Sequence, residues 1–106
     1  LVTPEYNNGI PGVFKNAIDL MSLGPGLAYF VGKPVALLGA SPGGFGTVLA
    51  QNDWLPVLRT LKAELWAEGR MLVSRASGLF DENGALTDDR TRAALRDFIA
   101  GYSATL

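Results

Sequence analysis

The sequence contains no histidine and no cysteine. Their absence excludes serine-histidine triads, thiol nucleophiles, Cys/His zinc sites and disulfide frameworks. An excess of either charge is also missing, because 9 basic and 10 acidic residues leave a formal net charge of −1. Without a broad basic face, sequence-independent binding of nucleic acid is not expected. An enzyme built from this sequence would have to borrow its reactive atoms from a bound molecule.

Long apolar runs and a leader pattern are missing as well. No apolar stretch reaches about 18 residues without glycine, proline or charge, so no membrane span is predicted. The 106 residues, 48% of them hydrophobic, fit one small folded domain. We expect a cytoplasmic location, which the lack of cysteine permits. Leu1 opens the sequence without an initiator methionine or a secretion signal, as if from the middle of a longer chain.

Apolar periodicity predicts alternating strands and helices in the N-terminal two thirds. Residues 1–2 fit the end of a buried strand, and residues 35–38 form a continuous apolar run typical of a central strand in a parallel sheet. Helical spacing runs from Ile10 to Met21. A second helix follows, for which we expect Asp53 as N-cap with Pro56 in the first turn.

The C-terminal third continues the same alternation. Residues 71–73 are a further extended segment, whereas residues 65–66 could extend the preceding helix or form a short strand. Thr87 is expected to cap a last helix with an apolar face. That face consists of Leu95, Phe98, Ile99 and Tyr102. The order of elements predicts an α/β domain with a parallel sheet and right-handed crossovers.

Two segments rich in turn residues directly follow predicted strands. Asn7, Asn8 and Gly9 reverse the chain after the first strand. Residues 39–46 contain four glycines in eight positions, which permits close approach of a ligand to the backbone. This loop fits neither the P-loop nor the G-x-G-x-x-G pattern, so it indicates neither a nucleoside triphosphate site nor a Rossmann dinucleotide site.

Four ordered segments closely resemble the NADPH-dependent FMN reductase family, including its quinone-, azo- and chromate-reducing members. They are TPEYN at 3–7, GIPGV with KNAID at 9–19, GASPGGFG at 39–46, and FDENG with LTD at 80–88. The resemblance covers nearly the whole chain. It implies a flavodoxin-like, three-layer α/β fold with FMN bound at the carboxyl ends of the parallel strands.

The resemblance also implies which residues contact the cofactor. Those expected along the flavin ring, or closing on it from the neighbouring strand, are Pro4, Glu5, Tyr6, Asn7, Ser41, Gly43 and Gly44. Backbone amides from Glu5 to Asn7 could supply fixed donors for the negative charge that develops on a reduced flavin. No catalytic side chain and no metal ion are expected, in agreement with the missing histidine and cysteine.

The implied activity is that of an FMN-dependent NAD(P)H oxidoreductase. Hydride would pass from NADPH or NADH to the flavin, and on to a small-molecule acceptor such as a quinone, an azo compound, a metal oxyanion or free flavin. The family also implies a homodimer or homotetramer in which a neighbouring subunit helps to cover the flavin. The alternatives are a non-catalytic flavodoxin-like electron carrier or flavin-binding module, and a fragment that binds nothing.

Two departures from the family pattern stand out. The phosphate-binding loop that follows the first strand in flavodoxin-like proteins has no counterpart here, and the first strands are absent. We therefore expect residues 1–106 to be the C-terminal part of a larger flavodoxin-like FMN reductase domain. The second departure is local: family members often carry an arginine where this sequence has Thr47-Val48-Leu49.

Several other residues fit structural roles better than chemical ones. Trp54 and Trp66 are expected in the core or at an interface, and residues 81–83 in a surface turn that lacks the ligand spacing of a calcium loop. The adjacent carboxylates Asp88 and Asp89 suit the start of a helix. A solvated helix face, with an NADPH-phosphate contact as the weaker alternative, is expected for Arg90, Arg92 and Arg96.

Overall fold

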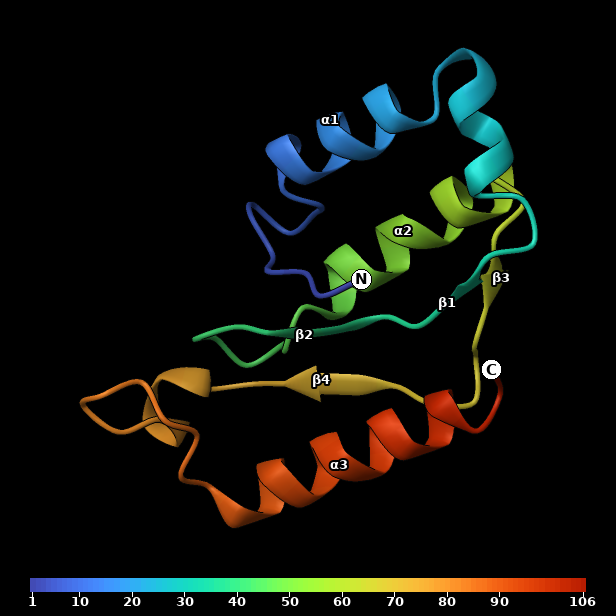
Figure 1. Cartoon of the computed structure of the whole chain (residues 1–106). Coiled ribbons are helices and arrows are strands. Elements are labelled where there is room, and N and C mark those ends of the chain that lie inside the picture. The colour runs from blue at the N-terminus through green and yellow to red at the C-terminus, as the bar shows by residue number, and fades with distance from the viewer.

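Short extended segments build one layer of parallel strands, as seen in a computed structural model that describes all residues 1–106 (Figure 1). β1 (Pro34–Val35) pairs with β3 (Glu64–Leu65), and β2 (Leu38–Ala40) pairs with β4 (Met71–Val73). Val2 forms a parallel bridge with Leu38 on the other side of β2. The segment containing β1 and β2 is therefore central, as its continuous apolar run predicts.

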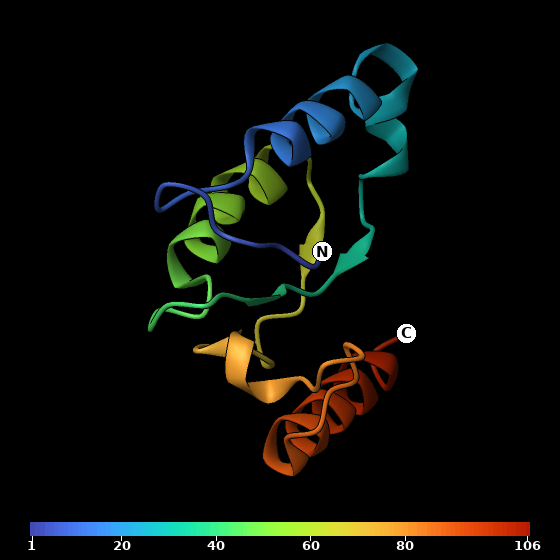
Figure 2. The same ribbon diagram turned by 90° about the vertical axis from the view of Figure 1, so that its left-hand side faces the viewer.

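Helices cover both faces of these strands. α1 (Gly12–Met21) and α2 (Val48–Thr60) lie on one face, and α3 (Asp89–Ser103) lies on the other (Figures 1 and 2). Two short 3₁₀ helices, η1 (Gly24–Tyr29) and η2 (Ala76–Leu79), follow α1 and β4. The predicted three-layer α/β arrangement with parallel strands is confirmed. None of the helices combines the length and apolar character that crossing a membrane requires.

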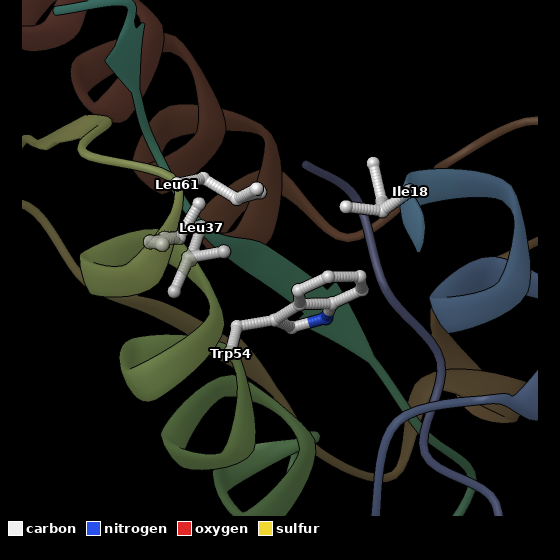
Figure 3. Close-up of a cluster of buried hydrophobic side chains, with 5 residues drawn as sticks. Ile18, Leu37, Trp54 and Leu61 are labelled. Atoms are coloured by element: carbon white, nitrogen blue, oxygen red, sulfur yellow. The ribbon is translucent and has the colours of Figure 1, made fainter. Parts of the chain in front are cut away.

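The larger core cluster lies between the sheet and the helices α1 and α2. Its buried members are Ile18, Leu37, Trp54, Leu58 and Leu61, shown as sticks in Figure 3. Trp54 is completely buried, and the edge-to-face contact of its ring with Phe14, at 4.8 Å between centroids, joins α2 to α1. The expectation that Trp54 belongs to the core is confirmed.

α3 packs over the opposite face through a smaller aromatic cluster. Phe98 and Tyr102 contact the ring of Trp66, with centroids 5.2 and 5.8 Å away. The Tyr102 hydroxyl donates to the carbonyl of Pro34 at 2.8 Å, which ties the last turns of α3 to β1. Ile99 lines a surface cavity on this face together with Phe98 and Tyr102, but 53% of it is exposed, so it is less buried than Phe98.

The start of α2 differs from the sequence-based expectation. The helix begins at Val48, so Pro56 lies in its interior and Asp53 lies in its middle. Pro56 donates no backbone hydrogen bond, and the helix continues through it because both flanking turns are packed against the core. The early start depends on a hydrogen-bond acceptor from a distant part of the chain, described below, which local sequence rules do not show.

α3 is capped one residue later than expected. Asp88, and not Thr87, is the N-cap: its Oδ2 accepts from the Thr91 amide at 2.9 Å and from the Thr91 hydroxyl at 2.6 Å. These hydrogen bonds stabilise the carboxylate and lower the pKa of Asp88 from its ordinary value. The stabilisation is therefore fully present above the ordinary pKa of an aspartate and is lost as the pH falls through the lowered one.

Replacing Asp88 should separate the contribution of the cap from that of the charge. We expect Asp88→Ala to lower the melting temperature at pH 7, and Asp88→Asn, which retains a good capping oxygen, to lower it less. Because Asn does not titrate, the difference between wild type and Asp88→Asn should shrink below about pH 4. Thermal unfolding followed by circular dichroism at pH 7 and pH 3 measures both. A difference independent of pH would contradict this role for the charge.

Candidate functional site

Three loops meet at the carboxyl ends of the strands. Residues 4–9 follow the N-terminal extended segment, residues 41–47 follow β2, and residues 74–79 follow β4. All three lie at the left-hand end of the strands in Figure 1, the end that faces the viewer in Figure 2. Parallel strands bring their carboxyl ends to the same edge, and open α/β sheets bind ligands there.

The first loop is a tight turn closed by its own backbone. The amide of Tyr6 donates to Gly9 and the amide of Gly9 donates to Tyr6, at 3.1 and 3.0 Å. Asn7 and Asn8, between them, have φ values of 50° and 64°, a conformation that asparagine tolerates well. The amide of Tyr6 is thus already used, so only the amides of Glu5 and Asn7 remain free of protein partners in the segment expected to face a flavin.

The side chain of Glu5 has a role that the sequence analysis missed. Its Oε2 accepts hydrogen bonds from the backbone amides of Leu49 and Ala50, both at 2.9 Å. Those amides belong to the first turn of α2, whose N-cap residue Thr47 makes no capping hydrogen bond of its own. Glu5 therefore caps α2 across a separation of more than forty residues and holds the first loop against the second.

The glycine loop exposes backbone donors. None of the amides from Gly43 to Thr47 donates a hydrogen bond within the protein. Those of Gly43, Gly44 and Phe45 belong to exposed residues, whereas Gly46 and Thr47 are buried. A methyl group added at Gly43 would meet no atom within 4 Å, and at Gly44 it would meet only Arg75, at 3.8 Å. The protein itself does not need glycine at these two positions, so the bare backbone suits close approach by a molecule from outside.

Two other glycines in and beside this loop serve the fold. A Cβ at Gly39 would collide with the Thr47 hydroxyl and the Thr3 carbonyl, and a Cβ at Gly46 would lie 2.8 Å from the backbone of Leu72. Gly39 thus lets the first strand approach, and Gly46, with φ of 56°, lets the loop pass over β4. The glycine-rich run therefore combines two structural positions with two that are open to solvent.

The loop after β4 clamps the glycine loop from the other side. The Arg75 amide donates to the Gly43 carbonyl at 2.8 Å, and the Ala76 amide donates to the Ser41 carbonyl at 2.9 Å. Ser41 in turn donates its amide to Val73 at 2.9 Å. The structure thus adds Arg75 and Ala76 to the residues expected at this site. The only sequence signal was their place directly after a strand.

A buried polar contact fixes the far side of the glycine loop. The Gln51 side chain donates to the hydroxyl of Thr47 at 3.1 Å and to the carbonyl of Met71 at 2.9 Å, and both Gln51 and Thr47 are buried. Thr47 adopts φ of 71°, which is unusual for a β-branched residue. The first turn of α2 is therefore tied to β4 and to Glu5 together, so the amides of the loop have a fixed position.

Aromatic rings stand on both loops at the solvent surface. Tyr6 on the first loop is 59% exposed, and Phe45 on the glycine loop is 65% exposed. Exposed rings beside unpaired amides suit a planar, amphipathic ligand that combines stacking with hydrogen-bond acceptors. No three acidic side chains come together in a way that could hold a metal ion. The two loops thus present backbone hydrogen-bond donors and exposed aromatic rings to a ligand.

The comparisons with known proteins agree with this geometry. The family model of NADPH-dependent FMN reductases matches residues 1–78. The chain belongs to the NADPH-dependent FMN reductase family. It is 38% identical over 104 residues to a 2-hydroxy-1,4-benzoquinone reductase of a Burkholderia species, covering 98% of this chain. It is 43% identical over 94 residues to an NAD(P)H-dependent FMN reductase of Pseudomonas aeruginosa, covering 89% of this chain.

A solved structure of the same kind supports the arrangement of the elements. FerB of Paracoccus denitrificans, a flavoenzyme NAD(P)H:(acceptor) oxidoreductase, matches 95% of this chain with a TM-score of 0.82 and 32% identity. The match covers 56% of the FerB chain, and the two reductases above are covered over 57% and 50% of their lengths. The chain thus spans little more than half the length of these proteins.

Removing the Glu5 cap should loosen the first turn of α2. We expect Glu5→Ala to destabilise the protein by about 1 kcal/mol, because two helix amides lose their acceptor. Glu5→Gln keeps a side-chain oxygen and should retain part of that stability. Urea unfolding followed by circular dichroism gives both values. Equal stability of Glu5→Ala and wild type would mean that the cap contributes nothing.

Proposed function

We propose that the chain is the C-terminal part of a flavodoxin-like domain that works as an FMN-dependent NAD(P)H oxidoreductase. Family membership and the named relatives support the reaction class. The proposed flavin position is the one predicted from the sequence, with Pro4, Glu5, Tyr6 and Asn7 on one loop. Ser41, Gly43 and Gly44 lie on the loop that Glu5 and Arg75 hold in place.

The exposed surface supports a larger domain. The chain exposes 6890 Å², whereas a folded monomer of 11.2 kDa should expose about 5,700 Å². The radius of gyration is 14.7 Å, against about 13 Å for a compact chain of this length. Val2 is 69% exposed on the edge strand, and its amide makes no backbone hydrogen bond. Further strand and helix units of a longer chain would cover this edge.

The hydrogen bonds of the Glu5 carboxylate are the observation that favours a flavin ring over a phosphate at this site. A free helix N-terminus binds phosphate readily, but at α2 the protein's own carboxylate already accepts from the first-turn amides. The glycine loop still offers the free amides of its exposed residues Gly43 to Phe45, and exposed rings stand on both loops, Tyr6 on the first and Phe45 on the glycine loop. That combination suits the flat, acceptor-rich isoalloxazine ring better than a phosphate.

The residues of the chain would bind and orient, and none would act as an acid, a base or a nucleophile. When bound, FMN supplies the two-electron chemistry, accepting hydride from a nicotinamide and delivering electrons to a second substrate. The free amides of Glu5, Asn7 and the glycine loop would stabilise negative charge on the ring edge. The clamps from Glu5 and Arg75 would keep these donors fixed, so little reorganisation accompanies the transfer.

The proposed electron acceptors are small molecules. One open stacking site would serve both substrates in turn, which supports a range of flat acceptors such as quinones, azo compounds and flavins, together with metal oxyanions. A homodimer or homotetramer is supported by the apolar side chains exposed on α1 and beyond it. These include Val13, Leu20, Met21, Leu23 and Tyr29. We propose a cytoplasmic location.

Anaerobic stopped-flow spectroscopy of the full-length protein tests the proposed reaction. We expect bound FMN to lose its absorbance near 450 nm within about a second of mixing with NADPH or NADH, and to regain it on addition of a quinone. Protein-free FMN with the same nucleotides is the control. A protein that holds FMN but is not reduced by either nucleotide would be an electron carrier, which would overturn the proposal of a reductase.

The open glycines allow a sharper test of where the ring binds. We expect Gly43→Ala to leave the melting temperature within about 2 °C of wild type but to weaken FMN binding roughly tenfold, because the added methyl group meets only the ligand. Gly12→Ala is the matched control, since its methyl group also meets nothing within 4 Å and Gly12 belongs to α1 and not to the glycine loop. Fluorescence titration with FMN measures binding. Unchanged affinity in Gly43→Ala would place the ring elsewhere.

A further inference from the structure

Arg75 stands beside the glycine loop and is not used by the proposed flavin contacts. It follows β4 by two residues, and its guanidinium Nη2 lies 3.8 Å from the position a Cβ would take on Gly44. Because Gly44 has no side chain, the guanidinium rests against bare backbone at the entrance to the loop. The guanidinium of Arg75 thus lies beside the exposed part of the loop, where the amides from Gly43 to Phe45 have no partner within the protein.

The backbone of Arg75 holds the side chain in this place. Its amide donates to Gly43 at 2.8 Å, and the next amide, of Ala76, donates to Ser41 at 2.9 Å. Arg75 adopts φ of 50°, a conformation in which glycine or asparagine would be less strained. Of the five non-glycine residues with positive φ, four lie on the loops of this site: Asn7, Asn8, Thr47 and Arg75. For Thr47 and Arg75 this conformation is strained, and backbone strain clusters at functional sites.

The positive charge of Arg75 is not neutralised within the protein. The one ion pair of the chain joins Lys15 to Asp19 on α1, away from these loops. The carboxylate of Glu5, which caps the helix after the glycine loop, accepts hydrogen bonds from two helix amides. The surface around Gly44 therefore offers hydrogen-bond donors together with an unpaired cation, a combination complementary to an anion.

We propose that Arg75 binds an anionic group of a redox substrate that reaches the glycine loop. This inference rests on the proposed function, in which the loop carries the flavin ring. The anion has two possible sources with the same chemistry: a phosphate of the nicotinamide dinucleotide, or an acidic substituent on the electron acceptor. Arg75 would then be a determinant of substrate specificity, and it would take no part in the electron transfer itself.

Replacing Arg75 by asparagine removes the charge but keeps a residue that accepts the positive φ. We expect Arg75→Asn, in the full-length protein loaded with FMN, to raise the KM of the anionic substrate about tenfold with kcat within twofold of wild type. Arg75→Lys should recover part of the loss. Arg59→Gln, which removes the same charge at an exposed position in the last turn of α2, is the matched control.

The choice of substrates distinguishes the sources of the anion. If KM rises for NADPH alone, and adenosine 2′,5′-bisphosphate binds more weakly by calorimetry, the anion that Arg75 binds is the 2′-phosphate. An equal loss with NADPH and NADH assigns the pyrophosphate. A loss seen only with a sulfonated quinone, and not with a neutral one, assigns the acceptor. In each case the wild-type KM should rise with ionic strength more steeply than that of Arg75→Asn.

Two results would overturn the role of Arg75. One is a set of KM values that Arg75→Asn changes no more than Arg59→Gln does. The other is a changed reduction potential or FMN affinity with unchanged KM values, because the cation would then act on the flavin. If the full-length protein binds no FMN, the proposed function fails, whereas calorimetry with adenosine 2′,5′-bisphosphate still tests whether Arg75 binds an anion.

Discussion

The acceptance of two α2 amides by the Glu5 carboxylate is the interaction on which the site depends. It joins a loop that follows the first strand to a helix that begins more than forty residues later, with both contacts at 2.9 Å. It satisfies donors that a helix always leaves unpaired and places a negative charge at the positive end of the helix dipole. Because of it, α2 begins at Val48, and the glycine loop is held between two anchored neighbours.

The same contact determines which kind of ligand the site can take. By filling the N-terminus of α2, Glu5 removes the anion site that glycine loops commonly form with the helix they precede. The amides of the exposed loop residues Gly43 to Phe45 are left as the available donors. Arg75 adds a cation on the other side of the same loop, held by backbone hydrogen bonds to the loop itself. In the proposed function, the surface that would bind the flavin ring is thus distinct from the cation of Arg75 beside it.

The glycines of this region are of two kinds, those that the packing requires and those that it does not. Gly39 and Gly46 are needed by the protein, because a side chain there would collide with the backbone of Thr3 or Leu72. Gly43 and Gly44 are not needed in this way, and their bare backbone faces outward. A glycine-rich stretch can therefore owe some of its residues to packing and others to a ligand, and only the surrounding atoms distinguish the two.

The amino-acid sequence alone determined the α/β alternation, the central strand and the reductase family, because periodicity and motifs are properties of neighbouring residues along the chain. It also identified the two loops that meet at the site. Tertiary structure decided three other features. Glu5 caps α2, Pro56 lies inside that helix, and Arg75 lies beside Gly44. Each of these depends on strands that lie side by side in the sheet but far apart along the chain, and no local pattern encodes such a contact.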